Sequence, residues 1–92
     1  MTALSRQVAI TNKRGLHARA SAKFVNLASE LGETKIEVEK DGNRVCGTSI
    51  MGLMMLGAAM GDSITISATG IGAEQAVAQL SALVEAKFHE DV

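Results

Sequence analysis

The chain of 92 residues contains no proline, tryptophan or tyrosine, only two phenylalanines and a single cysteine. So few aromatic rings leave little surface on which nucleic-acid bases could stack. The formal net charge of −1 gives no bulk attraction to a phosphate backbone either. The lone Cys46 excludes an internal disulfide and a cysteine metal cluster, which suits a reducing cytoplasm. We therefore expect no nucleic-acid role, and we expect Cys46 to be a small buried filler rather than a reactive thiol.

Long hydrophobic runs are also lacking. The longest uncharged apolar stretch covers residues 48–61, which is too short to span a membrane and is interrupted by Gly52 and Gly57. The first ten residues show no apolar core or cleavage pattern, so we expect no secretory signal. Apolar residues make up 47% of the chain and charged residues 21%, a composition typical of folded proteins. The length fits one domain, residues 1–92.

Charge of one sign is missing from the N-terminal third. Before Glu30 there are no acidic residues and five basic ones, whereas four basic and ten acidic residues follow from Glu30 onward. This asymmetry predicts a basic face that suits acidic partners or anions. The alternative is chance scatter over a solvated surface. The five basic residues are Arg6, Lys13, Arg14, Arg19 and Lys23.

Hydrophobic periodicity predicts an alternation of strands and helices. Period-two patterns favour strands at residues 5–11, 34–40 and 62–69, and the Asp41-Gly42 turn predicts a hairpin to a short strand at 43–46. A helical stripe begins at residue 18, and Gly32 is a plausible stop. Ser49 is a good N-cap for a short helix over residues 50–56. The first stripe comprises Ala20, Phe24, Leu27 and Leu31, and a final helix comprises Ala76, Leu80, Leu83 and Phe88.

The resulting order is β-α-β-β-α-β-α. Strands of period two have one buried and one wet face, as in antiparallel sheets. Each of the two longer helices has a single apolar stripe, so both are expected on the same side of the sheet. The sequence therefore predicts an α+β fold, an open-faced two-layer sandwich.

The junction between the first strand and the first helix carries a candidate site. His17 lies where the first helix begins, with Arg14 three residues before and Arg19 two residues after. The first turn of a helix offers unpaired N–H groups and a positive dipole end, which together stabilise an anion. Neutral imidazole is a nucleophile toward phosphorus, and arginine binds phosphate oxygens. The alternative is that His17 is only a cap or a solvated residue.

A metal site is not expected. The only other histidine, His89, lies near the C-terminus, and the chain offers no cysteine cluster to complete a ligand set. We expect His89 to be a surface residue close to the end of a helix.

Three segments resemble one known family. G-L-H-A-R-A-S-A at residues 15–22 is similar to the active-site segment of HPr, the phosphocarrier of the bacterial phosphoenolpyruvate-dependent phosphotransferase system and its nitrogen-related branch. T-S-I-M-G-L-M-M-L-G at 48–57 resembles the second signature of that family, and G-D-S-I-T-I at 61–66 resembles its last strand. Nearly the whole chain is covered. The resemblance implies a four-stranded antiparallel sheet with three helices on one face.

The resemblance also implies roles for individual residues. His17 would carry the phosphoryl group on Nδ1 and Arg19 would stabilise it, with Ala18 and Ala20 in the phosphate cradle. Ala20 departs from the family, which commonly has proline there, so the cradle is expected to differ in detail because alanine supplies an extra N–H. Ser49 matches a regulatory serine modified by a dedicated kinase/phosphorylase. The resemblance implies that Ile50, Met51 and Met54 form the patch that docks partner proteins. Arg14, just before His17, is a further candidate for partner binding.

Ser49 and the methionines each have a simpler reading. In the simpler interpretation, Ser49 is only an N-cap that stabilises the helix by about 1 kcal/mol. In the regulatory interpretation, phosphorylation would add roughly −1.5 to −2 charges beside a docking patch. Methionine is usually core filler. A helix this short, however, cannot bury all its apolar residues in one direction. We assign Met51 and Met54 to an interface, and Met55 or Leu56 to the core.

The leading hypothesis is a cytoplasmic, monomeric phosphoryl relay without a cofactor of its own. Phosphorylated enzyme I would donate to His17, which would donate to an EIIA-type protein in either sugar uptake or nitrogen-type regulation. Whether such a carrier is called an enzyme is a matter of definition. Two alternatives stay open. One is a regulatory domain that binds a ligand on its open sheet, for which His17 is replaceable, and the other is an interaction module that uses the methionine patch.

Overall fold

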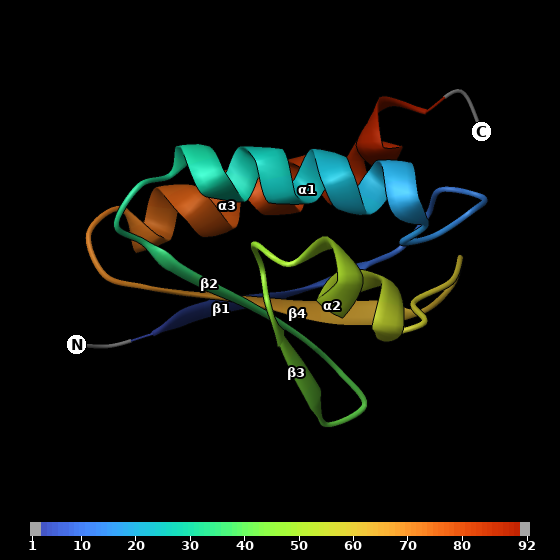
Figure 1. The fold of residues 1–92 in the computed structure, drawn as a ribbon, viewed down its shortest axis with the longest axis horizontal. Helices are drawn as coiled ribbons and strands as arrows, with labels where there is room; N and C mark the ends of the chain where they lie inside the picture. The colour runs from blue at the N-terminus through green and yellow to red at the C-terminus, as the bar shows by residue number, and fades with distance from the viewer. Residues whose placement is uncertain (1–2, 91–92) are drawn as a thin grey trace.

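The computed structural model describes residues 3–90 and shows the predicted order of elements (Figure 1). A 3-10 turn, η1, follows the last helix. The elements are β1 (Leu4–Ala9), α1 (Ala18–Glu30), β2 (Lys35–Lys40), β3 (Asn43–Cys46), α2 (Ile50–Met55), β4 (Ser63–Thr69), α3 (Ala73–Glu85) and η1 (Lys87–His89).

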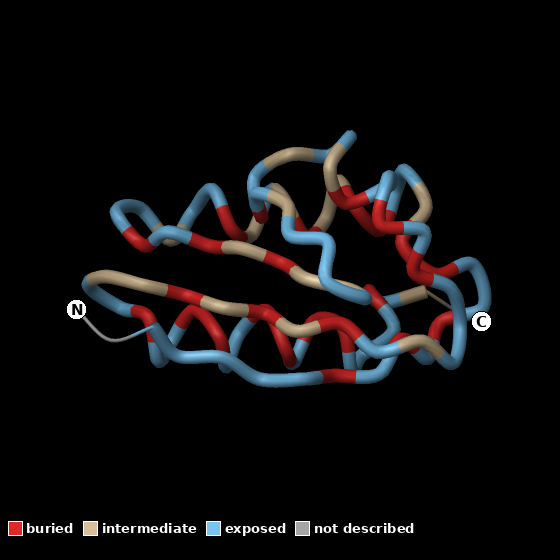
Figure 2. The backbone as a smooth tube through the Cα atoms, turned by 90° about the horizontal axis from the view of Figure 1, so that it is seen from below, coloured by how far each residue is buried: buried red, intermediate tan, exposed pale blue. Residues whose placement is uncertain are grey.

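The four strands form one antiparallel sheet in the order β1-β4-β2-β3. The register pairs Val8 with Ile64 and Val38 with Ile66, so these buried side chains share one face. Figure 2 shows buried positions alternating with less buried ones along the strands. The period-two hydrophobic pattern of the sequence therefore corresponds to side chains that point alternately to the two faces of the pleated sheet.

The helices cover one face of this sheet and confirm the predicted fold. α1 and α3 lie side by side above the strands, and the smaller α2 contacts α1 and β3 (Figure 1). Phe24 from α1, Leu80 from α3 and Ile66 from β4 are all fully buried in the layer between helices and sheet. Burying a large apolar side chain of this kind stabilises the fold by about 1.5–3 kcal/mol.

The last helix is shorter than predicted. α3 ends at Glu85, and Phe88 lies in η1, where Lys87, Phe88 and His89 have φ values of 58°, 55° and 61°. The apolar periodicity was a correct sign that Phe88 is buried, but burial does not require a continuous helix. The chain turns in a left-handed conformation at residues 87–89, and the Phe88 ring enters the core from there.

The prediction of a buried Cys46 is wrong. Cys46 pairs with Glu37 across β2 and β3, and its side chain is exposed. Its Sγ lies 3.0 Å from Oγ1 of Thr48, and this hydrogen bond lowers the pKa of the Cys46 thiol. Sequence alternation did not reveal this orientation because β3 has only four residues.

None of the helices within residues 3–90 has the length and hydrophobicity needed to cross a membrane.

Candidate functional site

The loop that carries His17 is held in place by the loop that follows α2. Ile10 N–H donates to the Asp62 carbonyl at 2.7 Å, and Leu16 N–H donates to the Ala58 carbonyl at 3.0 Å. Gly15 has a φ of 64°, and a Cβ added there would lie 2.3 Å from the Ala58 carbonyl oxygen. Only glycine fits this approach. The close contact fixes the backbone two residues before His17.

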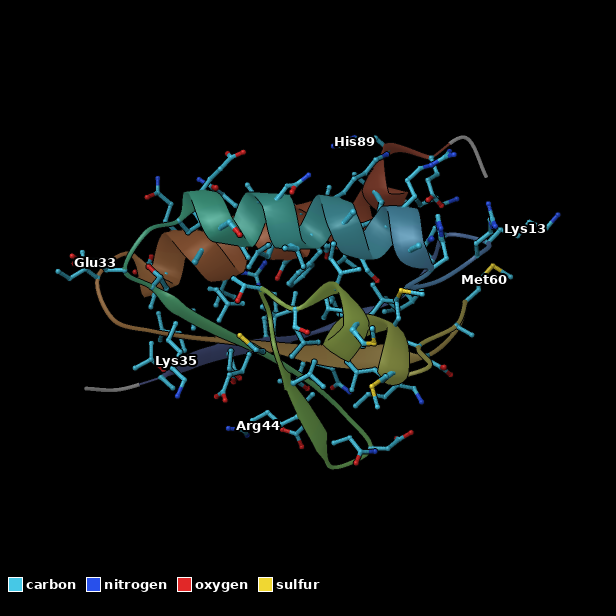
Figure 3. The ribbon with its side chains drawn as sticks, in the orientation of Figure 1. Lys13, Glu33, Lys35, Arg44, Met60 and His89 are labelled. Atoms are coloured by element: carbon cyan, nitrogen blue, oxygen red, sulfur yellow. The ribbon has the colours of Figure 1, made fainter. Side chains whose placement is uncertain are left out.

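This end of the molecule gathers four segments that are distant in the sequence. The loop at residues 10–17, the start of α1, the loop at 57–62 and η1 all lie at the right of Figure 1. In Figure 3, Lys13 and Met60 mark this end, and Glu33 marks the opposite one. The candidate site is therefore assembled by tertiary structure.

His17 is the N-cap of α1. Its backbone is extended, and its Nδ1 accepts a hydrogen bond from Arg19 N–H at 3.3 Å. The first intrahelical bond is donated by Ser21 N–H to the His17 carbonyl at 2.9 Å, so the amides of Ala18 and Ala20 precede the regular ladder. The side chain is 16% exposed. Nδ1 is thus directed at the amides of the first helical turn.

The other ring nitrogen is paired with a carboxylate. Nε2 of His17 lies 2.5 Å from Oε2 of Glu90, whose side chain is only 11% exposed. Nδ2 of Asn12, which is fully buried, donates to Oε1 of Glu90 at 3.0 Å and to the Gly15 carbonyl at 2.9 Å. The imidazole therefore lies between the amides of α1 on one side and the Glu90 carboxylate on the other.

The environment of Glu90 favours its charged form. Burial raises the pKa of this carboxyl group, but hydrogen bonds with Asn12 and His17, together with the charges of His17 and Lys23, outweigh it. The net effect is a pKa below the ordinary value. Glu90 therefore presents a negative charge to the ring at neutral pH.

The basic side chains expected near His17 are present and exposed. Lys13, Arg14 and Arg19 are all at the surface, and no ion pair involves them among residues 3–90. Ala18 is exposed, whereas the side chain of Ala20 is fully buried. What Ala20 offers to an anion is therefore its N–H, which proline would lack. Within the described part of the chain, no three His, Cys, Asp or Glu residues are grouped to hold a metal.

Ser49 caps the helix α2, which carries the apolar patch. The Ser49 Oγ accepts a hydrogen bond from Gly52 N–H at 3.0 Å, as an N-cap does. The hydrophobic side chains of α2 that remain exposed line a shallow hollow of about 520 Å³. We call this the methionine patch: Ile50, Met51, Met54 and Met55. Of the two alternatives expected for the core, Met55 or Leu56, it is Leu56 that is buried, and Met55 is 78% exposed.

Sequence reasoning missed Glu90, Asn12 and Met55. Glu90 is 73 residues from His17, and nothing local predicts their contact. Asn12 was recognisable only as part of a polar break. The available signal was Phe88, an apolar residue two positions before Glu90, because a buried ring near the chain end holds its neighbours against the fold.

Comparisons with known proteins identify the family of this chain. The family described as the PTS HPr component phosphorylation site matches residues 4–86. The chain belongs to the HPr phosphocarrier family. It is 44% identical to the phosphocarrier protein NPr of Shewanella violacea over 90 residues, which are 98% of each chain. It is 40% identical to the phosphocarrier protein HPr of Cupriavidus necator over 87 residues, 95% of this chain and 97% of that one.

A solved structure agrees over the whole length. The crystal structure of HPr-C-His from Thermoanaerobacter tengcongensis has a TM-score of 0.88 and 42% sequence identity, with 100% of both chains covered. A role as a phosphocarrier of the phosphotransferase system follows from membership of the HPr family.

Proposed function

We propose that His17 accepts a phosphoryl group from phosphorylated enzyme I on Nδ1 and passes it to an EIIA-type protein. The observation that carries this proposal is the direction of Nδ1, which faces the first-turn amides of α1. A phosphoryl group on this atom would sit where the helix dipole and unpaired N–H groups favour negative charge.

Transfer requires one local exchange of hydrogen bonds. The lone pair of Nδ1 accepts from Arg19 N–H in the free protein. When this lone pair forms the N–P bond, the bond between phosphorus and phosphorylated enzyme I breaks. Arg19 N–H then loses its hydrogen-bond acceptor and is released. That N–H, with those of Ala18 and Ala20, then becomes available to the phosphoryl oxygens. Because the donors are already in place, little reorganisation accompanies the step.

The exposed cations around His17 support the same step. Arg19 would neutralise charge on the transferring phosphoryl group, as arginine does in phosphoryl transfer generally. Arg14, on the preceding loop, would contribute to binding an acidic partner. Such charges chiefly accelerate encounter and orient the two proteins.

The methionine patch supports docking to more than one partner. Met51, Met54 and Ile50 are 70%, 45% and 41% exposed and adjoin one another, and such contiguous apolar patches mark interaction surfaces. Flexible methionine side chains repack against different surfaces. A carrier needs this property because it meets a donor and an acceptor in turn.

The deciding experiment is phosphorylation by enzyme I. The protein is incubated with enzyme I, phosphoenolpyruvate and Mg²⁺, the ion that enzyme I requires, and its intact mass is measured before and after acid treatment. We expect one acid-labile phosphoryl group in the wild type and none in His17→Ala. The matched control is His89→Ala, which removes the exposed histidine of η1 and should accept phosphate normally.

Ser49→Ala provides a second control and should also accept phosphate from enzyme I. Phosphate that persists in acid would indicate a serine ester and contradict the proposal. If the wild type accepts no phosphate and His17→Ala binds partner proteins as well as the wild type does, the regulatory ligand-binding domain or the interaction module would be favoured instead.

We further propose that Ser49 is a regulatory phosphorylation site for an HPr kinase/phosphorylase. Ser49 precedes the methionine patch directly, so a phosphoserine would place about −1.5 to −2 charges at the edge of the docking surface. We propose that the protein acts as a monomer in the cytoplasm, because a monomer leaves His17 and the methionine patch free to meet a donor and an acceptor in turn. Incubation with candidate EIIA proteins of the sugar and nitrogen branches would identify the acceptor.

A further inference from the structure

We propose that Glu90 is a positioning residue that keeps the proton on Nε2 of His17 throughout phosphoryl transfer, so that the ring always leaves phosphorus as neutral imidazole. This inference rests on the proposed function of His17 and adds a role for the C-terminal turn. It starts from one contact, the 2.5 Å approach of Glu90 Oε2 to His17 Nε2.

The contact fixes the roles of the two ring nitrogens. A carboxylate only accepts hydrogen bonds, so Nε2 must carry the proton that it shares with Glu90. Nδ1 accepts from Arg19 N–H, so Nδ1 must carry the lone pair. Both contacts select the same tautomer, the one in which the nucleophilic atom faces the anion-binding end of α1.

The electron count explains why the proton matters. Attack by Nδ1 forms the N–P bond and leaves the ring as a phosphoryl-imidazolium with its proton still on Nε2. In delivery, the N–P bond breaks, and its electron pair returns to Nδ1, which gives neutral imidazole. If the phosphorylated ring lost its Nε2 proton to water, the leaving group would be imidazolate, a far stronger base. Glu90 opposes this loss because its negative charge stabilises the imidazolium.

The structure holds the carboxylate in position for this role. Phe88 is fully buried, and Lys23 Nζ donates to the Phe88 carbonyl at 2.7 Å, so η1 is tied to the core and to α1. The buried Asn12 amide fixes the second oxygen of Glu90. Three consecutive residues of η1 adopt positive φ values, which L-amino acids rarely do. The energetic cost of this turn is offset by Phe88 burial, and its result is the delivery of Glu90 to His17.

Other charged groups surround this pair. From α1, Lys23 faces Glu90 and acts on its charge, and Arg19 is exposed at the helix start. Lys13 and Arg14 on the preceding loop, and Lys87 and His89 in η1, are also exposed. These surface groups are screened by solvent and salt, whereas Glu90 contacts the ring directly. Its removal is therefore expected to dominate any change in the protonation of phosphorylated His17.

The test compares Glu90→Gln with Glu85→Gln. The first keeps a hydrogen-bond acceptor of the same size but removes the charge, and the second removes a charge from an exposed position on α3. Each protein is phosphorylated by enzyme I and phosphoenolpyruvate and then separated from them. Nitrogen NMR follows the protonation of Nε2 as a function of pH. The rate of phosphoryl transfer to an EIIA-type acceptor is measured over the same pH range.

For Glu90→Gln we expect the midpoint of Nε2 protonation in the phosphorylated protein to move about one pH unit lower. Delivery at neutral pH should be up to about tenfold slower, because a shift of one pKa unit changes the protonation equilibrium tenfold, and it should recover as the pH is lowered. Glu85→Gln should match the wild type. Equal midpoints for phosphorylated wild type and Glu90→Gln would overturn the inference alone, and a wild type that accepts no phosphate would overturn the proposed function with it.

Discussion

Lys23 Nζ donates a hydrogen bond to the carbonyl oxygen of Phe88 at 2.7 Å, across 65 residues of sequence. This bond ties η1 to the helix that begins at His17, and the Phe88 ring secures the same turn from inside the core. The start of the first helix, α1, and the C-terminal turn η1 thus meet at one site (Figure 1). The position of Glu90 depends on packing as much as on its own hydrogen bonds.

Replacing Phe88 is expected to destabilise the fold and release Glu90 together. Phe88→Ala removes a fully buried ring and should cost about 3–5 kcal/mol in the free energy of unfolding. Phe88→Leu retains much of the apolar volume and should cost less, so it remains folded for study. Urea unfolding measures the loss, and hydrogen exchange of the residues of η1 reports the loosened turn. His89→Ala, at the exposed neighbouring position, should leave both values unchanged.

Gly15→Ala is expected to displace the loop that carries His17. Alanine at a φ of 64° is strained by about 2 kcal/mol, and its Cβ would lie 2.3 Å from the Ala58 carbonyl oxygen. The hydrogen bond from Leu16 N–H to that carbonyl must then lengthen or break. Urea unfolding and the amide chemical shifts of residues 15–19 measure these effects. Gly57→Ala has a similar φ of 65° but open space around it, so it should show the strain without the shifts near His17.

The fold was predictable because its signals are local. Period-two alternation at residues 34–40 and 62–69 appears in the structure as the two central strands, and the Asp41-Gly42 turn appears as the β2–β3 hairpin. The start of α1 was also predictable, since His17 directly precedes a helical stripe and caps the helix. Each of these features depends on residues within a few positions of one another.

The rest of the site was not predictable because it depends on long-range geometry. The contact of Glu90 with His17 requires a left-handed turn in which Phe88 is buried beyond the end of α3, and periodicity does not encode that turn. Cys46 lies on a strand too short for alternation to assign its face. Ala20 has two roles that a hydrophobic pattern does not distinguish, because its buried side chain is part of the core while its N–H lies at the candidate site.

The pairing of Glu90 also predicts a pH dependence of stability. The pKa of Glu90 is lower in the folded protein than the ordinary value of 4.5. A carboxyl group with a depressed folded pKa contributes stability that is fully present above its unfolded pKa and is lost as the pH falls through its folded pKa. Glu90→Gln should therefore be less stable than the wild type near neutral pH. The difference in unfolding free energy should shrink below about pH 4.

Urea titrations of both proteins across this range measure the effect. Glu74→Gln removes an exposed carboxylate in the first turn of α3 and controls for a general loss of negative charge. A difference between wild type and Glu90→Gln that stays constant down to the most acidic pH would show that the folded pairing of Glu90 does not contribute to stability through its charge.

Two substitutions of Ser49 distinguish its role as a helix cap from an effect of its charge on docking. Ser49→Ala removes the acceptor for Gly52 N–H and should cost about 1 kcal/mol of stability, with phosphoryl transfer from enzyme I little changed. Ser49→Asp retains an acceptor at the start of α2 but adds a negative charge beside the methionine patch. Because an uncompensated charge at an apolar interface is costly and an acidic partner repels it, transfer should slow by about tenfold.

The matched control for Ser49→Asp is Thr48→Asp, which adds the same charge one residue earlier at an exposed position. Rates of phosphoryl transfer and urea midpoints are measured for all three variants. Equal slowing by Thr48→Asp and Ser49→Asp would indicate a general effect of charge in this loop. Unchanged transfer in Ser49→Asp would contradict the regulatory role, because the charge would then stand beside the patch without hindering the partner. Slowing confined to Ser49→Asp would place the regulatory charge at the N-cap of α2, where it meets the docking surface without unfolding the helix.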